Sequence, residues 1–488
     1  MVADFQCSSS REPLSDDHGQ NNLMRINTGI RFAKKLVQAV SLSTAAWFCV
    51  SPAVVMSQST HGSSASDQRS KDAGLTLKGA VDLALKQNLD IQIANIQTAM
   101  YEQDRVTARS DLLPHASFEG DASINRHNLR ALLGIQIPIA SVPHSIGPYE
   151  AVHVGPTFSV PVFDLTLIRR YQESGHALIA SRADEQTVRE ETVLLTVSEY
   201  MAHLRSLASI EAAQSRVELA TRLTHQAEDL LTDGVASRID VSRARVKLSE
   251  EQQSLIDNQR DAKTTLDALK RILNMPDGQG LDFLDRQDFF HTPSIDLSDP
   301  LKEALAQRSE LHSLSERSNV AELAKSAAAA ESVPRFAVNG FWDLQGGTFN
   351  TATPGYEYRI SMSVPIFMGG RLRAERRRTA LAAEQVKKQV VEKRNEVTEQ
   401  VRNEEVELQS APGQVDLGRQ EVQLATEEVA LSQGRFQSGV ADNIEVTQAQ
   451  DSLARANDAE IGALFRYNIA RARLARAVGS AETLYARP

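Results

Sequence analysis

The second half of this chain restates its first half. Gly-Val-Ala-Ser-Arg-Ile-Asp-Val at 234–241 returns as Gly-Val-Ala-Asp-Asn-Ile-Glu-Val at 439–446, and Ser-Val-Pro-Val-Phe at 159–163 returns as Ser-Val-Pro-Ile-Phe at 363–367. The offsets are 205 residues (439 minus 234) and 204 residues (363 minus 159), so the two copies run in register. Solenoid repeats are only about 20 to 50 residues long. The pattern therefore indicates a duplicated, domain-sized unit.

The duplication predicts the domain organisation of the 488 residues. The expected segments are a leader and signal peptide at 1–57, a polar linker at 58–74, a first repeat at 75–275, an inter-repeat linker at 276–297, a second repeat at 298–480 and a short tail at 481–488. Each repeat is predicted to run helix, two strands, very long helix, tight turn, helix. The first copy has extra residues, including Pro138, Pro143, Gly147 and Pro148, which are expected to form an exposed loop between its two strands.

The start of the chain has the pattern of an export signal. Basic residues precede the mostly apolar stretch Leu36–Met56, which ends in small residues near Ser57. Cleavage is expected near Ser57, with Met24 as an alternative start. A short membrane anchor is the alternative interpretation, which the polar residues within the stretch disfavour. Because Cys7 and Cys49 both precede Ser57, the mature chain is expected to have no disulfide.

Four segments alternate apolar and polar residues with the period of a strand. They are Ser117–Asn125, Val152–Val162, Phe336–Leu344 and Tyr356–Val364. Such strands fit either a soluble sandwich or a membrane barrel with a wet lumen. The export signal and strand lengths of about ten residues favour the barrel. Since the smallest barrels need about eight strands, several chains would have to share one barrel.

The remaining residues of each repeat are helical by composition and spacing. A first helix is expected over 76–112, with Leu83, Leu85, Leu89, Ile93 and Ile96 on one side. Two very long helices are expected at 165–233 and 369–438, each on the order of 100 Å at 1.5 Å per residue. A coiled-coil rod without a pore fits the helices equally well, so a periplasmic scaffold or adaptor is the alternative function.

Composition excludes several other classes of function. The formal net charge is −10, whereas binding of nucleic acid needs clustered cations, so nucleic acid is not an expected partner. The 11 histidines are scattered without metal-ligand spacing. We find no phosphate-binding glycine loop and no nucleophile elbow. We therefore expect that the chain is not an enzyme and that it has no catalytic residue, cofactor or metal.

The order and duplication of these motifs resemble the TolC-type outer-membrane efflux proteins over about 75–480. The marks are the doubled Gly-Val turns, the doubled Ser-Val-Pro strand ends, and Phe-Met-Gly-Gly-Arg at 367–371 before the long helix. The resemblance implies an α+β, mostly α fold: a homotrimer in which four strands per chain make a twelve-stranded transmembrane barrel above a periplasmic helical barrel. It also implies an exit duct in the outer membrane, extending into the periplasm. The implied partners are a periplasmic adaptor of the membrane fusion type, an inner-membrane pump reached through it, and outer-membrane lipid.

The resemblance also places the two glycine turns at a periplasmic tip, where adaptors dock. The turn residues are Gly234, Val235, Gly439 and Val440, and the gate residues are Asp240, Phe436, Glu445 and Gln448. The alternative for the glycines is simple helix termination. The alternative for Asp240 and Glu445 is stabilisation of a helix N-terminus, worth about 0.3 to 1 kcal/mol.

The tip departs from the best-known family pattern. Phe436 occupies a tyrosine position, Ala441 replaces a gating arginine, and Gln448 replaces an acid. We hypothesise that Phe436 closes the mouth by apolar contact instead.

A basic cluster follows the fourth strand, at Arg371, Arg373, Arg376, Arg377 and Arg378, with Arg169 and Arg170 at the matching place in the first copy. The default interpretation is a solvated helix face. The alternative is contact with anionic headgroups or with the lumen.

Overall fold

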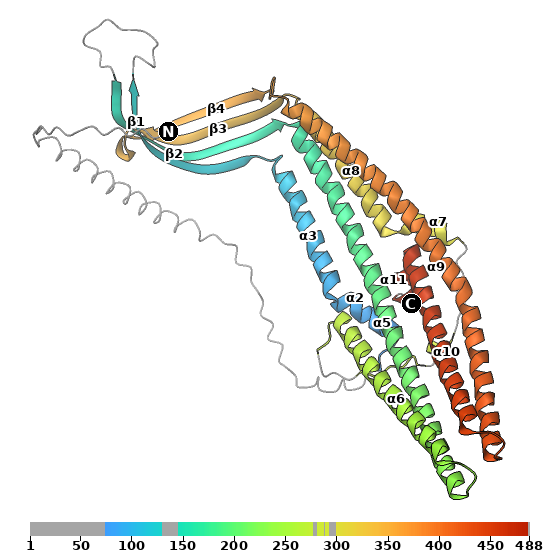
Figure 1. The fold of residues 1–488 in the computed structure, drawn as a ribbon. Coiled ribbons are helices and arrows are strands. Elements are labelled where there is room, and N and C mark those ends of the chain that lie inside the picture. The colour runs from blue at the N-terminus through green and yellow to red at the C-terminus, as the bar shows by residue number, and fades with distance from the viewer. Residues whose placement is uncertain (1–73, 129–144, 277–280, 287, 292–298, 487–488) are drawn as a thin grey trace, which may run out of the picture. The chain divides into compact units, whose positions relative to one another are not determined.

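A computed structural model describes residues 74–128, 145–276, 281–286, 288–291 and 299–486. The predicted signal, both cysteines, Pro138 and Pro143 lie outside the described residues. The first repeat contains α2 (Leu77–Gln87), α3 (Leu89–Ser110), β1 (His115–Asn128), β2 (Ser145–Phe163), α5 (Leu165–Thr232) and α6 (Arg238–Ile272). The second contains α7 (Pro300–Gln307), α8 (Ser309–Ala330), β3 (Arg335–Gly346), β4 (Thr353–Ser363), α9 (Arg371–Gln437) and α10 (Asn443–Val478), followed by α11 (Ala481–Tyr485). Figure 1 shows the same order in both repeats: two shorter helices, two strands, a very long helix and a helix that runs back along it.

The four strands form one antiparallel sheet in the order β1-β2-β3-β4. Its register aligns apolar rows on one face, where the rings of Phe158 and Tyr358 lie 5.8 Å apart across Gly340. Gly340 has to be glycine, because a Cβ there would stand 2.5 Å from the Phe158 ring. The other face is polar, and Ser159 Oγ donates to Asn339 Oδ1 at 2.7 Å. The sheet therefore has the apolar and polar faces that the alternation predicts.

Two local predictions were wrong. The expected helix at 76–112 is two helices, because buried Asn88 adopts an extended backbone between them, caps α3 with its side chain, and donates to the Ile272 carbonyl at 2.9 Å. Gly147 and Pro148 lie inside β2 and not in a loop, because its pairing with β1 continues to Ser145 past an irregularity near Asn125. Sequence alternation fails at such an irregularity.

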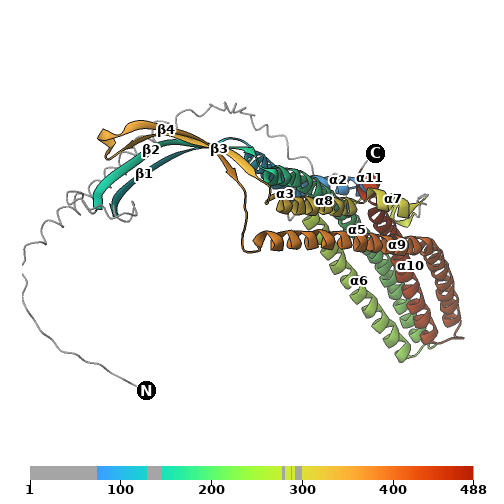
Figure 2. The ribbon, with the colours of Figure 1, turned by 90° about the horizontal axis from the view of Figure 1, so that it is seen from above.

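The long helices pack as two antiparallel hairpins. In Figures 1 and 2, α6 runs back along α5, and α10 runs back along α9. α5 also contacts α3, α8 and α10, which makes it the central helix of the chain. The main apolar cluster lies along α5, α6 and α10, with Val193, Tyr200, Leu269, Leu464 and Tyr467 among its members. Pro412 lies inside α9 without ending it.

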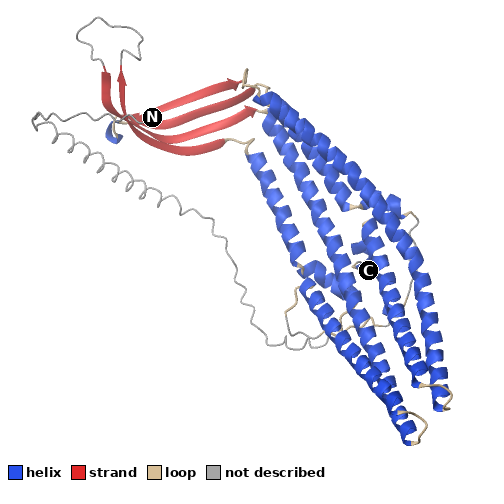
Figure 3. Ribbon diagram, in the orientation of Figure 1, coloured by secondary structure: helices blue, strands red, loops and turns tan. Residues whose placement is uncertain are grey.

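In Figure 3, the four strands (red) lie together, and the long helices (blue) extend from one end of them. Each strand has one end joined directly to a helix, at 111–114, 164, 331–334 and 364–370. The strand pairing places these four strand ends at the same end of the sheet, since His115 pairs with Ser159 and Arg335 pairs with Ser363. No helix within the described ranges is long and apolar enough to cross a membrane.

Candidate functional site: the tips of the two helical hairpins

The first hairpin turns at Gly234. Its φ of +76° is left-handed, which glycine adopts without strain, and the amide groups of Val235 and Ala236 both donate to the Leu230 carbonyl. Ser237 then starts α6 with a capping box: its own amide donates to Asp240 Oδ2 at 2.9 Å, and the amide of Asp240 donates back to Ser237 Oγ. The carboxylate of Asp240 is therefore used to cap its own helix.

The second hairpin turns in the same way at Gly439. Its φ is +69°, and the amide of Val440 donates to the Arg435 carbonyl at 3.0 Å. Asp442 caps α10 by accepting a hydrogen bond from the amide of Ile444 at 3.0 Å. Glu445 forms an ion pair with Arg435, Nε to Oε1 at 3.3 Å. The acid that the sequence places at the mouth thus has a basic partner on the same hairpin.

The two turns lie against each other. Asn443 donates from its side chain to the Asp240 backbone carbonyl at 2.8 Å. A Cβ on Gly439 would lie 3.6 Å from Val235. Asp240 therefore does contact the second hairpin, but through its backbone and not through its carboxylate. Sequence reasoning missed Asn443, because an asparagine at the start of a helix is usually a cap.

Phe436 is buried between the two hairpins. It belongs to an apolar cluster with Leu223 and Ala227 of α5, Val241 and Ala244 of α6, and Val446 of α10. Its ring thus joins all four helices just above the turns. The structure places Phe436 in an apolar contact between the hairpins of one chain, and closure of the mouth by this ring stays a hypothesis.

A buried network of charges lies further from the turns. Arg216 of α5 donates through Nε to Glu251 of α6 at 2.9 Å, and Glu251 also lies 2.9 Å from Lys247 Nζ. Lys247 forms an ion pair with Asp451 of α10. Burial alone would lower the pKa of Lys247, but its hydrogen bonds to Asp451 and Glu251 outweigh burial and raise it. The network therefore links the hairpins by charge; in sequence, its residues have the spacing of a solvated face.

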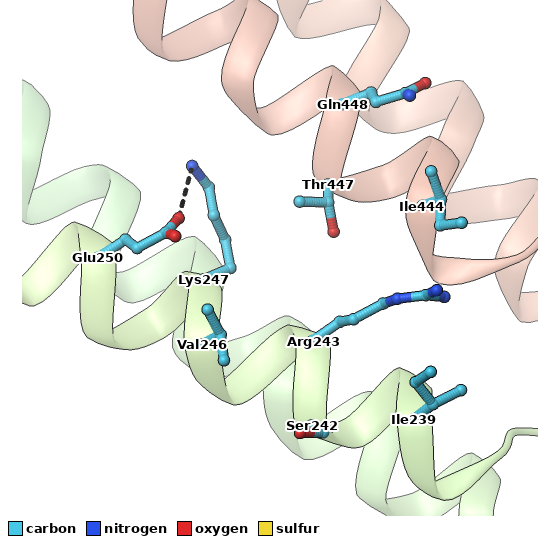
Figure 4. A pocket seen from close by; sticks show the side chains of 9 residues that line it. All are labelled: Ile239, Ser242, Arg243, Val246, Lys247, Glu250, Ile444, Thr447 and Gln448. Atoms are coloured by element: carbon cyan, nitrogen blue, oxygen red, sulfur yellow. Dashed lines mark ion pairs between the residues drawn. The ribbon is translucent and has the colours of Figure 1, made fainter.

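A groove of about 350 Å³ separates α6 from α10 near the turns (Figure 4). Ile239, Val246 and Ile444 give it apolar walls, and Arg243 extends across it toward α10 (Figure 4). Gln448, a predicted gate residue, lies on the α10 side of this groove and is exposed. Val235 and Val440 are exposed at the turns themselves. The arrangement offers apolar contact and hydrogen bonding but no group of three metal ligands among the described residues.

Comparison with known proteins decides the family. The sequence model of the outer membrane efflux proteins matches residues 80–275 and 301–480. The chain belongs to this family. It is therefore an outer-membrane exit channel that extends into the periplasm, from a family of channel proteins and not of enzymes.

Solved outer-membrane channels share the fold. The channel OprN superposes with a TM-score of 0.73 at 18% identity, covering 83% of this chain and 90% of that one. VceC from Vibrio cholerae superposes with a TM-score of 0.69 at 17% identity, covering 83% of this chain and 96% of that one. The open state of the MtrE channel from Neisseria gonorrhoeae gives 0.69 at 17%, covering 84% and 90%. The predicted fold class is confirmed, and the poreless scaffold is disfavoured.

Proposed function

We propose that this chain is the passive exit duct of a tripartite efflux or type I secretion system, without enzymatic activity, and that it works as a homotrimer gated at its periplasmic tip. The proposal that the tip is gated rests on one observation, the small set of contacts between the hairpin tips. They are the Phe436 cluster, the hydrogen bonds from Asn443 to Asp240 and from Gln433 to Gln226, and, further from the turns, the Lys247–Asp451 ion pair. Contacts of this size can be exchanged for others without unfolding the helices.

The sheet supports the trimer. β1 and β4 are its edges, and an unprotected edge is a template for pairing with another chain. Four strands cannot enclose a lumen, but pairing β4 with β1 of the next copy lets three chains close one barrel of twelve. The polar face, with Glu119, Asp121, Asp343 and Glu357, would then line the lumen.

Exposed rows of apolar side chains on two helices also support the trimer. On α3, Ile93 and Ile96 are each 63% exposed, and Leu89 and Met100 are also exposed. α9 exposes a second series, consisting of Leu381, Val391, Val406, Leu417, Leu424 and Leu431. Monomeric soluble proteins rarely leave such rows in water. Since α3 and α9 are the outermost helices of the series α3-α5-α8-α9, each can cover the other in a neighbouring copy.

The tip supports an adaptor as partner. Val235 and Val440 are 57% and 70% exposed at the turns, next to the groove between α6 and α10. Exposed valines beside a groove suit a helical partner with small apolar residues at its end. An inner-membrane pump, joined through that adaptor, would supply the energy that a passive duct lacks.

Planar-bilayer conductance of the purified protein, with its mass in detergent measured alongside, tests the proposal. We expect a mass of three chains and small, cation-preferring current steps. Phe436→Ala should enlarge the steps, and Glu445→Gln should weaken the cation preference. Phe290→Ala, which removes an exposed ring outside the tip, is the matched control. A trimer without conductance would refute the channel, and unchanged steps in Phe436→Ala would refute the gate.

A further inference from the structure

The link between β4 and α9 carries large apolar side chains into solvent. Ile366 is 96% exposed and Phe367 is 88% exposed in the loop 364–370, which Figure 2 shows leading to the start of α9. Gly369 and Gly370 follow with φ of +57° and +86°, and no atom lies within 4 Å of a Cβ built on either. The backbone thus turns into α9 without covering the two side chains.

The first copy shows that this link is special to the second. There, Phe163 is followed at once by Asp164, whose side chain caps α5 by accepting from the amide of Thr166 at 2.9 Å. No loop intervenes, and Phe163 still pairs with Phe336, past a shift of register after Pro161, and is 41% exposed. The duplicated strand end therefore does not by itself require an exposed Ile-Phe pair.

Arginines without partners stand next to that pair. Three of the five arginines in the first turns of α9 are satisfied: Arg371 by Glu331 at 3.0 Å, Arg376 by the Ala329 carbonyl at 3.2 Å, and Arg378 by Glu375 at 2.6 Å. Arg373 and Arg377 are exposed, and neither guanidinium forms an ion pair or hydrogen bond with any residue that the structure describes. Being four residues apart, they share one face of the helix.

The position of the segment along the chain fixes what surrounds it. The exposed apolar row of β4, with Tyr356, Tyr358, Ile360 and Met362, leads by alternation toward Val364 and Ile366. In a channel whose strands cross the outer membrane, the strand ends that join the long helices lie at the periplasmic surface of the bilayer. An apolar pair followed within two turns by unpaired arginines matches the order of acyl chains and phosphates in a lipid leaflet.

We propose that residues 364–377 bind anionic phospholipid of the periplasmic leaflet, with Ile366 and Phe367 among the acyl chains and Arg373 and Arg377 on the phosphates. This inference rests on the proposed function only in taking β1 to β4 as the membrane-crossing part. Continuity with the apolar row of β4 and the excess of positive charge favour lipid over a second copy of the chain as the occupant.

The experiment uses the full-length protein in phosphatidylethanolamine vesicles with and without phosphatidylglycerol. Phe367→Trp, in a background where Trp47 and Trp342 are Phe, reports the surroundings of the loop. We expect blue-shifted emission that brominated phosphatidylglycerol quenches more strongly than brominated phosphatidylethanolamine. The double variant Arg373→Gln with Arg377→Gln should lower the relative affinity for phosphatidylglycerol about thirtyfold, since each arginine near a surface contributes about one kcal/mol.

The matched control is Arg394→Gln with Arg402→Gln, which removes two exposed arginines roughly 25 Å or more further along the same helix. It should keep the preference for phosphatidylglycerol. Equal quenching by both lipids, with the double variant behaving like its parent, would overturn the proposal. So would blue-shifted emission that no lipid quenches, which would mean that a second copy covers the loop. Failure of the parent protein to conduct would refute the proposed channel, whereas a conducting protein without lipid preference refutes only this inference.

Discussion

α5 and α9 are counterparts of nearly equal length, at 68 and 67 residues, yet they occupy different surroundings. α5 is covered by α3, α6, α8 and α10, and it buries side chains along most of its length. α9 is covered by α8, α10 and α7, buries far fewer residues, and exposes leucines at 417, 424 and 431. Duplication thus copied the helix but not its environment. The uncovered face of α9, like that of α3, is what a neighbouring copy is expected to cover.

The largest expected effect comes from charging that uncovered surface. Ile93→Glu with Ile96→Glu on α3 should abolish the trimer, because burying an Ile side chain contributes about 1.5 to 3 kcal/mol at each of the contacts. Mass in detergent should fall to that of one chain. Gln92→Glu with Asn95→Asp adds the same charge to exposed polar positions of α3 and should leave the trimer intact. An intact trimer in the isoleucine variant would show that α3 faces water.

The next effect concerns the buried charges that α5 and α6 share. Arg216→Met should destabilise the hairpin region, because buried Glu251 then keeps Lys247 as its basic partner but loses Arg216; the loss should stay below the roughly 3 to 5 kcal/mol expected for a charge left wholly uncompensated. The double variant Arg216→Met with Glu251→Met should recover part of that loss, although Lys247 keeps Asp451. Denaturant unfolding of both variants measures the difference. Equal stability of the single and double variants would contradict the assigned network.

The central position of α5 also predicts a pH dependence of stability. His203 is buried against Phe283, which lowers its pKa to about 4 from an ordinary value near 6.5. His203 therefore binds a proton below about pH 6.5 in the unfolded chain, whereas in the folded chain it binds one only below about pH 4. This histidine should remove up to roughly 3 kcal/mol of stability as pH falls across that window. Thermal unfolding of the parent and of His203→Gln at pH 7 and pH 4.5 measures this effect. The melting temperatures of the two proteins should converge at the lower pH. An equal difference at both pH values would exclude this contribution of His203.

The smallest effects distinguish the two tips. Ser237→Ala should cost about 1 kcal/mol locally, because it breaks one half of the capping box. Asp442→Ala should cost a similar amount at the second tip, where the cap has no reciprocal partner. Hydrogen exchange of the first turns of α6 and α10 would resolve the two. Faster exchange confined to the altered tip is expected, whereas faster exchange at both tips would mean that the turns open together.

Much of the architecture could be predicted because local patterns carry it. Alternation gave the four strands, composition gave both long helices, and the doubled Gly-Val motif gave both turns, where φ is positive at Gly234 and Gly439. The break at Asn88 could not be predicted, because its cause is a hydrogen bond to Ile272, which lies 184 residues away. The pairing that draws Gly147 and Pro148 into β2 is likewise decided by the partner strand.

The same division holds at the candidate site. The sequence by itself determined two like helical hairpins with glycine turns, because φ preferences and hydrophobic periods act within a few residues; the channel was implied by the resemblance of the doubled motifs to the efflux family. Only the tertiary structure decided that Phe436 packs between hairpins, and that Arg216 of α5 meets Glu251 and Lys247 of α6 in a buried network. These contacts join residues of different helices, and their energy depends on burial, which no local pattern encodes.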